Sequence, residues 1–274
     1  MLYGITKGKY RYQVESLKLK FKDLPQAFNG YKIIQISYIH AGSFDSIDQV
    51  AKGVAMINDQ NPDIVVFTSD LVNSNKNEID PYIETFAKIK AKDGVYAILG
   101  NHDYYGISSR SSEQKQKTYW DDFFSKFKAM GFQLLNNEHA FIEKANERIA
   151  LVGVENWGAG NWFPKRGDLD KALPNNNKDF KVLLSHDPAH WDKQVIDHPE
   201  HIHLTLSGHT HGFQFGINLL WFKWSPAQYR YPHWLGLYEK KEQFLYVNRG
   251  FGFLAFPGRV GMWPEITVLE LEKA

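Results

Sequence analysis

Short apolar runs and amphipathic stretches alternate along the first half of the chain. The runs contain few polar positions, which is typical of strands buried on both faces, and the stretches between them carry apolar residues at helical spacing, as at Val50, Val54 and Ile57. We predict strands at residues 31–37, 63–69 and 94–100, and helices at residues 46–59, 78–91 and 112–130. This alternation indicates a parallel sheet that is covered by helices.

The second half of the chain is richer in strands. We predict them at residues 131–135, 139–144, 148–156, 180–187, 202–212, 244–250 and 265–272. No linker rich in Ser, Gly or Pro and no internal repeat separates the two halves. We therefore expect one domain over residues 1–274, built from two packed sheets, with residues 1–30 as an N-terminal extension; whether a membrane anchor precedes that extension stays open.

Composition and charge narrow the classes of function. With 43% hydrophobic residues the chain can build a large core, and its 32 basic against 31 acidic residues give no electrostatic argument for a nucleic-acid partner. The absence of cysteine excludes disulfides and thiolate chemistry. No apolar run reaches the ~20 residues of a membrane span, and no signal peptide is recognisable. We expect a protein of the cytoplasm or of the membrane surface.

Polar residues with metal-binding side chains follow the apolar strands. Loops at the carboxyl ends of strands meet at one edge of an α/β sheet, so side chains on different loops there are expected to share a site. Neutral imidazole, carboxylate and amide oxygen together suit divalent Zn, Mn or Fe. These residues are Tyr38, His40, Asp70, Asn101, His102, Asp103, His186, His209 and His211.

A structural role is the alternative for each histidine taken singly. It is the preferred interpretation for six histidines that do not follow a strand in this way, namely His139, His190, His198, His201, His203 and His233. Tyr38 and His40, two positions apart on an expected strand, should point the same way, and in isolation they would be a core tyrosine and a polar cap. It is the number of strand ends carrying such residues that favours a metal site.

The ordered motifs GNHD, SHDP and GHTHG, which follow TSDLVN, resemble those of the calcineurin-like metallophosphoesterase superfamily over roughly residues 31–250. Within it the chain most resembles the bacterial branch of membrane-associated phosphodiesterase-like enzymes that includes hydrolases of UDP-diacylglucosamine. The resemblance implies an α/β fold, a four-layer α-β-β-α sandwich of two mixed sheets, with two divalent metal ions at the carboxyl ends of the strands.

The resemblance also implies roles for individual residues. Asp70 would bridge the two ions, and Asn101, His186 and His209 would complete the second site. His40 and His211 would hold the first. His102, held by Asp103, would donate a hydrogen bond or proton to the departing oxygen.

Two positions depart from the family motif. Tyr38 stands where the family has a metal-binding aspartate, and Ser69 stands where it has glycine. A phenol, whose unperturbed pKa is about 10, is a poor ligand for Zn or Mn at neutral pH. The first site is therefore expected to bind metal more weakly than the second.

The segment 217–238 is crowded with Trp, Phe and Tyr. It either packs on the core as a long loop or forms a lip that contacts a membrane surface or an acyl chain. Arg230 and Arg249 are candidate contacts for a substrate phosphate.

Three functions stay open. The first is a dinuclear hydrolase of a phosphomonoester, phosphodiester or pyrophosphate in a small-molecule or lipid-linked substrate. The second is an impaired form, or pseudoenzyme, with an incomplete first metal site. The third is a nuclease, which the near-neutral charge disfavours.

Overall fold

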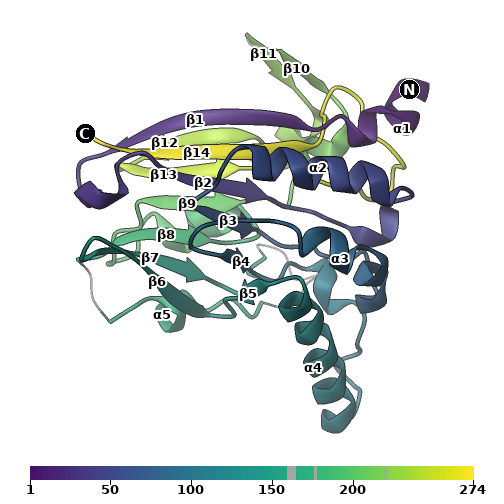
Figure 1. The fold of residues 1–274 in the computed structure, drawn as a ribbon, viewed down its shortest axis with the longest axis horizontal. Helices are drawn as coiled ribbons and strands as arrows, with labels where there is room; N and C mark the ends of the chain where they lie inside the picture. The colour runs from purple at the N-terminus through teal and green to yellow at the C-terminus, as the bar shows by residue number, and fades with distance from the viewer. Residues whose placement is uncertain (159–164, 176–177, 220) are drawn as a thin grey trace.

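Two six-stranded sheets form the centre of the computed structural model, which describes residues 1–158, 165–175, 178–219 and 221–274 (Figure 1). The first sheet has the order β1 (Gln13–Phe21), β14 (Glu265–Lys273), β2 (Tyr31–Ile36), β3 (Ile64–Phe67), β4 (Val95–Ala97) and β5 (Phe132–Leu134). The second has the order β12 (Gly236–Lys240), β13 (Gln243–Val247), β9 (Leu204–Ser207), β8 (Phe180–Leu184), β7 (Glu147–Gly153) and β6 (Glu138–Lys144). Both sheets are mixed, since β14 runs antiparallel to β2, and β12 and β6 run antiparallel to their neighbours.

Helices and short turns complete the fold. The α-helices are α1 (Leu2–Thr6), α2 (Ile47–Asp59), α3 (Ile83–Phe86), α4 (Glu113–Ala129) and α5 (Leu169–Ala172). Segments of 3₁₀ or, for η6, π-helical backbone are η1 (Gly8–Tyr10), η2 (Gln26–Phe28), η3 (Ala41–Ser43), η4 (Lys76–Tyr82), η5 (His102–Tyr104), η6 (Trp191–Val195), η7 (His211–Gln214) and η8 (Pro226–Tyr229). A separate hairpin of β10 (Ile217–Leu219) and β11 (Phe222–Trp224) projects from the body beside α1 (Figure 1).

Strand alternation divides the buried side chains between the layers. On β2, Ile34 packs toward α2, α3 and α4, whereas Ile33 packs into the space between the two sheets. Val65 and Val66 divide in the same way on β3. A third cluster lies between the second sheet and the segments α5 and η6. Three apolar interfaces separate four layers, so the predicted α-β-β-α sandwich is confirmed, with a thin outer layer over the second sheet.

One predicted helix is wrong. The segment 78–91 forms the 3₁₀ turn η4 followed by the single-turn helix α3. Pro81 lies inside this segment. Because proline has no N–H and clashes with the preceding turn, it interrupts the regular helix that the apolar spacing predicted.

The N-terminal residues expected as an extension contribute to the first sheet, since β1 pairs in parallel with β14 along its whole length. Among the residues that the structure describes, none of the helices combines the length and the apolar character that crossing a membrane requires. Residue 220, within the aromatic segment 217–238, lies outside the described residues.

Candidate metal centre

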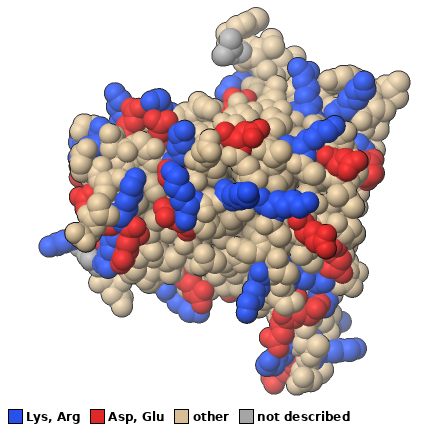
Figure 2. Space-filling view, in the orientation of Figure 1, with Lys and Arg blue, Asp and Glu red and all other residues tan. Residues whose placement is uncertain are grey.

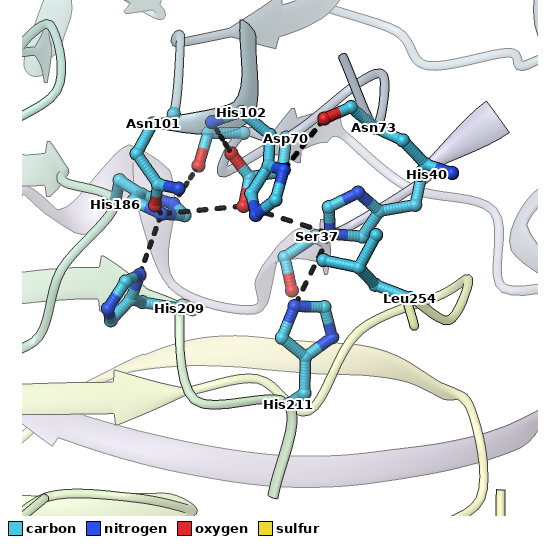
Figure 3. Close-up of polar contacts among 12 residues, drawn as sticks. Ser37, His40, Asp70, Asn73, Asn101, His102, His186, His209, His211 and Leu254 are labelled. Carbon is cyan, nitrogen blue, oxygen red and sulfur yellow. Dashed lines mark hydrogen bonds and ion pairs between the residues drawn. The ribbon is translucent and has the colours of Figure 1, made fainter. Parts of the chain in front are cut away.

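The loops that follow β2, β3, β4, β8 and β9 bring the predicted polar residues together (Figure 3). Asp70 lies in the middle, with His40 and His211 on one side and Asn101, His186 and His209 on the other. Side chains from five separate loops therefore meet at one edge of the paired sheets, as expected for the carboxyl ends of parallel strands.

The first group of ligand atoms belongs to His40, Asp70 and His211, which lie within 4.8 Å of one another. His40 Nε2 lies 3.3 Å from His211 Nε2 and 3.8 Å from Asp70 Oδ2. His40 Nδ1 lies 3.2 Å from the carbonyl oxygen of Val72, so the ring proton is donated there and the lone pair of Nε2 faces the group. Two imidazole nitrogens and a carboxylate oxygen converge here, and together they can coordinate a cation.

The second group is arranged in the same way around His186. Its Nε2 lies 2.7 Å from Asn101 Oδ1, 3.0 Å from His209 Nδ1 and 3.5 Å from Asp70 Oδ2. The other ring nitrogen, Nδ1, contacts the hydroxyl of Ser69. Asp70 Oδ2 thus lies within 4 Å of a histidine nitrogen of each group. The donor set fits two divalent ions that share this carboxylate.

Burial sets the protonation states in a form suited to metal binding. Loss of solvent lowers the pKa of His186 to about 3 and that of His209 to about 4, and holds the pKa of His40 and His211 well below the usual value. Burial also raises the pKa of Asp70, and among the residues that the structure describes no lysine or arginine pairs with this carboxylate. Neutral imidazoles beside an uncompensated carboxylate are the environment that a divalent cation stabilises.

The same pKa shifts predict a loss of stability in mild acid for the metal-free protein. Six imidazoles have pKa values below the unperturbed 6.5, the buried ones of His40, His186, His190 and His203 and the half-buried ones of His209 and His211. Below 6.5 the unfolded chain binds protons that the folded chain does not, so the free energy of unfolding falls as the pH approaches 4. The raised pKa values of Asp70 and Asp103 act in the opposite direction, but these two carboxyl groups offset only part of the effect of six imidazoles.

We therefore expect the midpoint of thermal unfolding, measured after chelation, to fall between about pH 7 and about pH 5. Protein saturated with Mn is the comparison, since bound metal keeps the imidazoles unprotonated and should reduce the change. A metal-free midpoint that rises toward acid would contradict the neutral state of these histidines.

The loops that carry the site hold an unusual backbone conformation. Positive φ values occur at Tyr38 (51°), Ser69 (91°), Asp70 (57°) and His211 (53°), none of them glycine. Such conformations cost roughly 1–3 kcal/mol each and persist where surrounding contacts enforce them. The backbone is thus strained where it presents the ligand atoms.

Tyr38 lies beneath the first group of ligands. The ring of Tyr38 stacks on that of His40, with 5.8 Å between the ring centroids, so the two side chains point the same way, as expected. The reason is not strand alternation, because β2 ends at Ile36, before both residues. The ring of His211 is closer, at 3.9 Å. A side chain at Gly208 or Gly250 would collide with the Tyr38 ring, so the two glycines form its slot. Its buried hydroxyl has no hydrogen-bond partner among the residues described.

His102 is oriented differently from the prediction. Its Nδ1 lies 2.8 Å from the carbonyl oxygen of Asn73, and its backbone N–H donates to Asp70 Oδ1 at 3.0 Å. The Asp103 carboxylate instead accepts from the backbone N–H groups of Leu71 and Gly100, both at 2.9 Å. The expectation that Asp103 holds the imidazole is therefore wrong, because this carboxylate is buried between the two loops and ties them together.

The two candidate arginines differ. Arg249 is buried, with Nε 2.7 Å from Glu265 Oε2 and Nη2 2.7 Å from Glu15 Oε1. Its guanidinium is occupied by carboxylates, which corrects the expected contact with phosphate. Arg230 is exposed and lies over the ring of Tyr231, and its contact with substrate stays a prediction.

Tyr231 is a residue that the sequence did not single out. Its hydroxyl lies 3.3 Å from His209 Nε2, so it orients the imidazole whose Nδ1 faces the second group. The only signal in the sequence was its place in the aromatic segment. The six histidines assigned structural roles all lie outside the two groups; His190, for example, contacts Ser185 and Gln194.

Comparison with known proteins gives a consistent result. Residues 31–213 match the family described as calcineurin-like phosphoesterase. A zebrafish (Danio rerio) protein described as a transmembrane protein with metallophosphoesterase domain is 30% identical over 100% of this chain and 60% of its own length. The corresponding cattle (Bos taurus) protein is 29% identical over 95% of this chain and 57% of its own length. The chain thus spans less than two thirds of these two relatives.

The metallophosphoesterase YkuE of Bacillus subtilis is 28% identical over 98% of this chain and 90% of its own length. Among solved structures, phosphopantetheinyl hydrolase from Mycobacterium tuberculosis has a TM-score of 0.45 and 11% identity, covering 80% of this chain and 88% of that one. None of these descriptions names a UDP-diacylglucosamine hydrolase, so that finer resemblance stays a prediction.

Proposed function

This chain belongs to the calcineurin-like phosphoesterase family, and on that premise we propose that it is a metal-dependent hydrolase with two divalent ions, which cleaves a phosphomonoester, phosphodiester or pyrophosphate bond. The observation that carries the proposal is the position of Asp70 Oδ2, 3.8 Å from His40 Nε2 and 3.5 Å from His186 Nε2. One carboxylate oxygen between two sets of neutral nitrogen donors is the arrangement that a shared ligand requires.

The chain's own residues have distinct tasks in this reaction. His40, His211 and Asp70 would hold one ion, and Asp70, Asn101, His186 and His209 the other. When bound, the ions supply positive charge against the phosphate and lower the pKa of a water molecule that attacks phosphorus. Mn, Zn and Fe all suit these ligands.

His102 is the candidate proton donor. Because its Nδ1–H is donated to the carbonyl oxygen of Asn73, Nε2 is the nitrogen left to face the substrate. From there the imidazolium can deliver a proton to the departing oxygen. Tyr231 fixes the direction of His209 through the contact at 3.3 Å.

The net charge of the chain and the descriptions of its relatives both bear on the class of substrate. The formal charge of +1 offers little attraction for a nucleic-acid backbone, so we favour a small phosphorylated molecule or a lipid-linked one. The description of the zebrafish and cattle relatives as transmembrane proteins is compatible with a substrate at a membrane.

A second candidate is an impaired form that holds a single ion. It is favoured by Tyr38, which fills the slot beneath His40 and His211 and leaves the first group with three ligands instead of the four of the family motif. Metal content per chain, measured by elemental analysis beside turnover of an aryl phosphodiester, separates the candidates. Two ions with turnover support the hydrolase, whereas one ion without turnover supports the impaired form.

We expect Mn²⁺ soaked into crystals to give an anomalous peak at the second group, since Asp70, Asn101, His186 and His209 are all present there. Crystals of an Asn101→Ala variant are the control, and their peak should weaken because one oxygen ligand is lost. A parent crystal without a peak within coordination distance of these four side chains would contradict the proposed site.

A further inference from the structure

The β10–β11 hairpin turns its apolar face away from the protein. In its register Ile217 lies opposite Trp224, and Leu219 lies opposite Phe222, so these four side chains share one face. Ile217, Leu219 and Phe222 are 44%, 50% and 44% exposed. Trp221, at the turn, is 85% exposed. If the hairpin only stabilised the fold, its apolar face would be expected to pack against the body of the protein.

The polar face of the hairpin is the one that meets the body. Asn218 and Lys223 lie opposite each other and line a small cavity of about 110 Å³ together with Glu15 of β1 and Arg249. The usual orientation of a surface ribbon, with its polar face toward water, is therefore reversed. An apolar surface placed outward in this way indicates an apolar partner.

The apolar surface continues beyond the hairpin. At its base Gly216 N–H donates to the carbonyl oxygen of Val260 at 2.9 Å, and Arg259 N–H donates to that of Gly4 in α1 at 3.2 Å. The loop 254–263 thus lies between the base of the hairpin and α1, and Figure 1 shows both elements on the same side of the molecule. Tyr3 of α1 and Phe215 add exposed rings to this surface.

Charge distinguishes this end of the molecule from the rest. Although the chain has 31 acidic residues, the segments 1–14, 201–238 and 243–264, which include the hairpin and α1, contain none. Carboxylates from elsewhere in the chain meet these segments paired with cations, as Asp45 is with Lys9 and Glu15 with Arg249. The exposed charged side chains of these segments include Lys7, Arg11, Lys223 and Arg230. Figure 2 shows blue and red side chains mixed over the body, while the tip that projects from the top of the molecule is tan.

From these observations we propose that the β10–β11 hairpin, with α1 beside it, docks on the surface of an anionic lipid bilayer. Trp and Tyr at the edge of an apolar surface suit the interface between headgroups and acyl chains, and the exposed lysines and arginines around that surface suit a negatively charged membrane. The inference does not depend on hydrolytic activity. Because η7 carries His211 and leads into the hairpin, docking would hold the metal centre near the lipid headgroups.

The test is co-sedimentation of the full chain with vesicles of equimolar phosphatidylcholine and phosphatidylglycerol, compared with vesicles of phosphatidylcholine alone. We expect binding to the mixed vesicles, with the partition coefficient about tenfold lower for Trp221→Ser and lower still for Leu219→Ser with Phe222→Ser. Lys7→Glu with Lys223→Glu should weaken binding to the mixed vesicles by at least about fivefold, with less effect at high salt.

The matched control is Ile47→Ser, which removes an apolar side chain of similar exposure, 47%, at the start of α2. It should bind vesicles as the parent does, and circular dichroism should report the same fold for all variants. Equal binding by Trp221→Ser and the parent would overturn the proposal. A concentration-dependent dimer that disappears in Trp221→Ser, without vesicle binding by the parent, would also overturn it and assign the surface to self-association.

Discussion

Replacing Asp70 with asparagine is expected to lower kcat/KM for an aryl phosphodiester by roughly a thousandfold or more, since each 1.4 kcal/mol of lost transition-state stabilisation is tenfold. The change keeps the shape of the side chain but removes the negative charge that both ligand groups share. Asp70 Oδ2 is the oxygen within 4 Å of both His40 and His186, so both ions should bind more weakly. The backbone hydrogen bond from His102 to Oδ1 can persist.

Two measurements make this prediction specific. Metal per chain should fall together with kcat, and excess Mn should restore little activity, because the lost charge acts in the reaction as well as in binding. Asp45→Asn is the control, since Asp45 pairs with Lys9 at the surface and should leave metal content unchanged. An Asp70→Asn enzyme with parental turnover would exclude Asp70 as a shared ligand.

Tyr38→Asp is expected to raise kcat/KM with saturating Mn by roughly one to two powers of ten, because it supplies the first group with a compact anionic oxygen. The ring of Tyr38 lies 3.9 Å from that of His211, so a shorter side chain at this position opens space next to a proposed ligand. The emptied slot between Gly208 and Gly250 will cost stability unless metal and water occupy it. Metal per chain should rise in parallel with activity.

Tyr38→Phe is the decisive companion variant. It retains the ring in its slot and removes only the hydroxyl, which has no hydrogen-bond partner among the described residues. If Tyr38→Phe loses metal and activity, the phenol oxygen is itself a ligand, and the expectation for Tyr38→Asp is wrong. Ser69→Gly should add to the gain, because Ser69 has a φ of 91°, which glycine adopts without strain.

The parts of the fold that depend on local pattern were predictable from the sequence. Nearly continuous apolar runs indicated β2, β3, β8 and β9, and the polar residues that follow them marked the loops of the metal centre. The gathering of these side chains follows from a general property of α/β sheets, so it needed no knowledge of tertiary contacts.

The rest depended on contacts between distant segments. The sequence could not tell that Asn73 rather than Asp103 would orient His102, because both lie on loops whose relative position is set by packing. Arg249 has the chemistry of a phosphate ligand, but Glu15 and Glu265 occupy it. The hairpin was also not predictable, because an apolar segment whose apolar face points outward has the same composition as one that is buried.

The position of β14 has a consequence for how the chain acquires its structure. Residues 265–273 lie between β1 and β2, and Lys18 and Glu270, which face each other there, are 252 positions apart in the sequence. Closing so long a loop is slow, and until it closes β1 and β2 each have an unpaired edge. On the ribosome the strand that leads to His40 therefore waits for β14 to be synthesised, and during that interval the nascent chain is most in need of protection from aggregation.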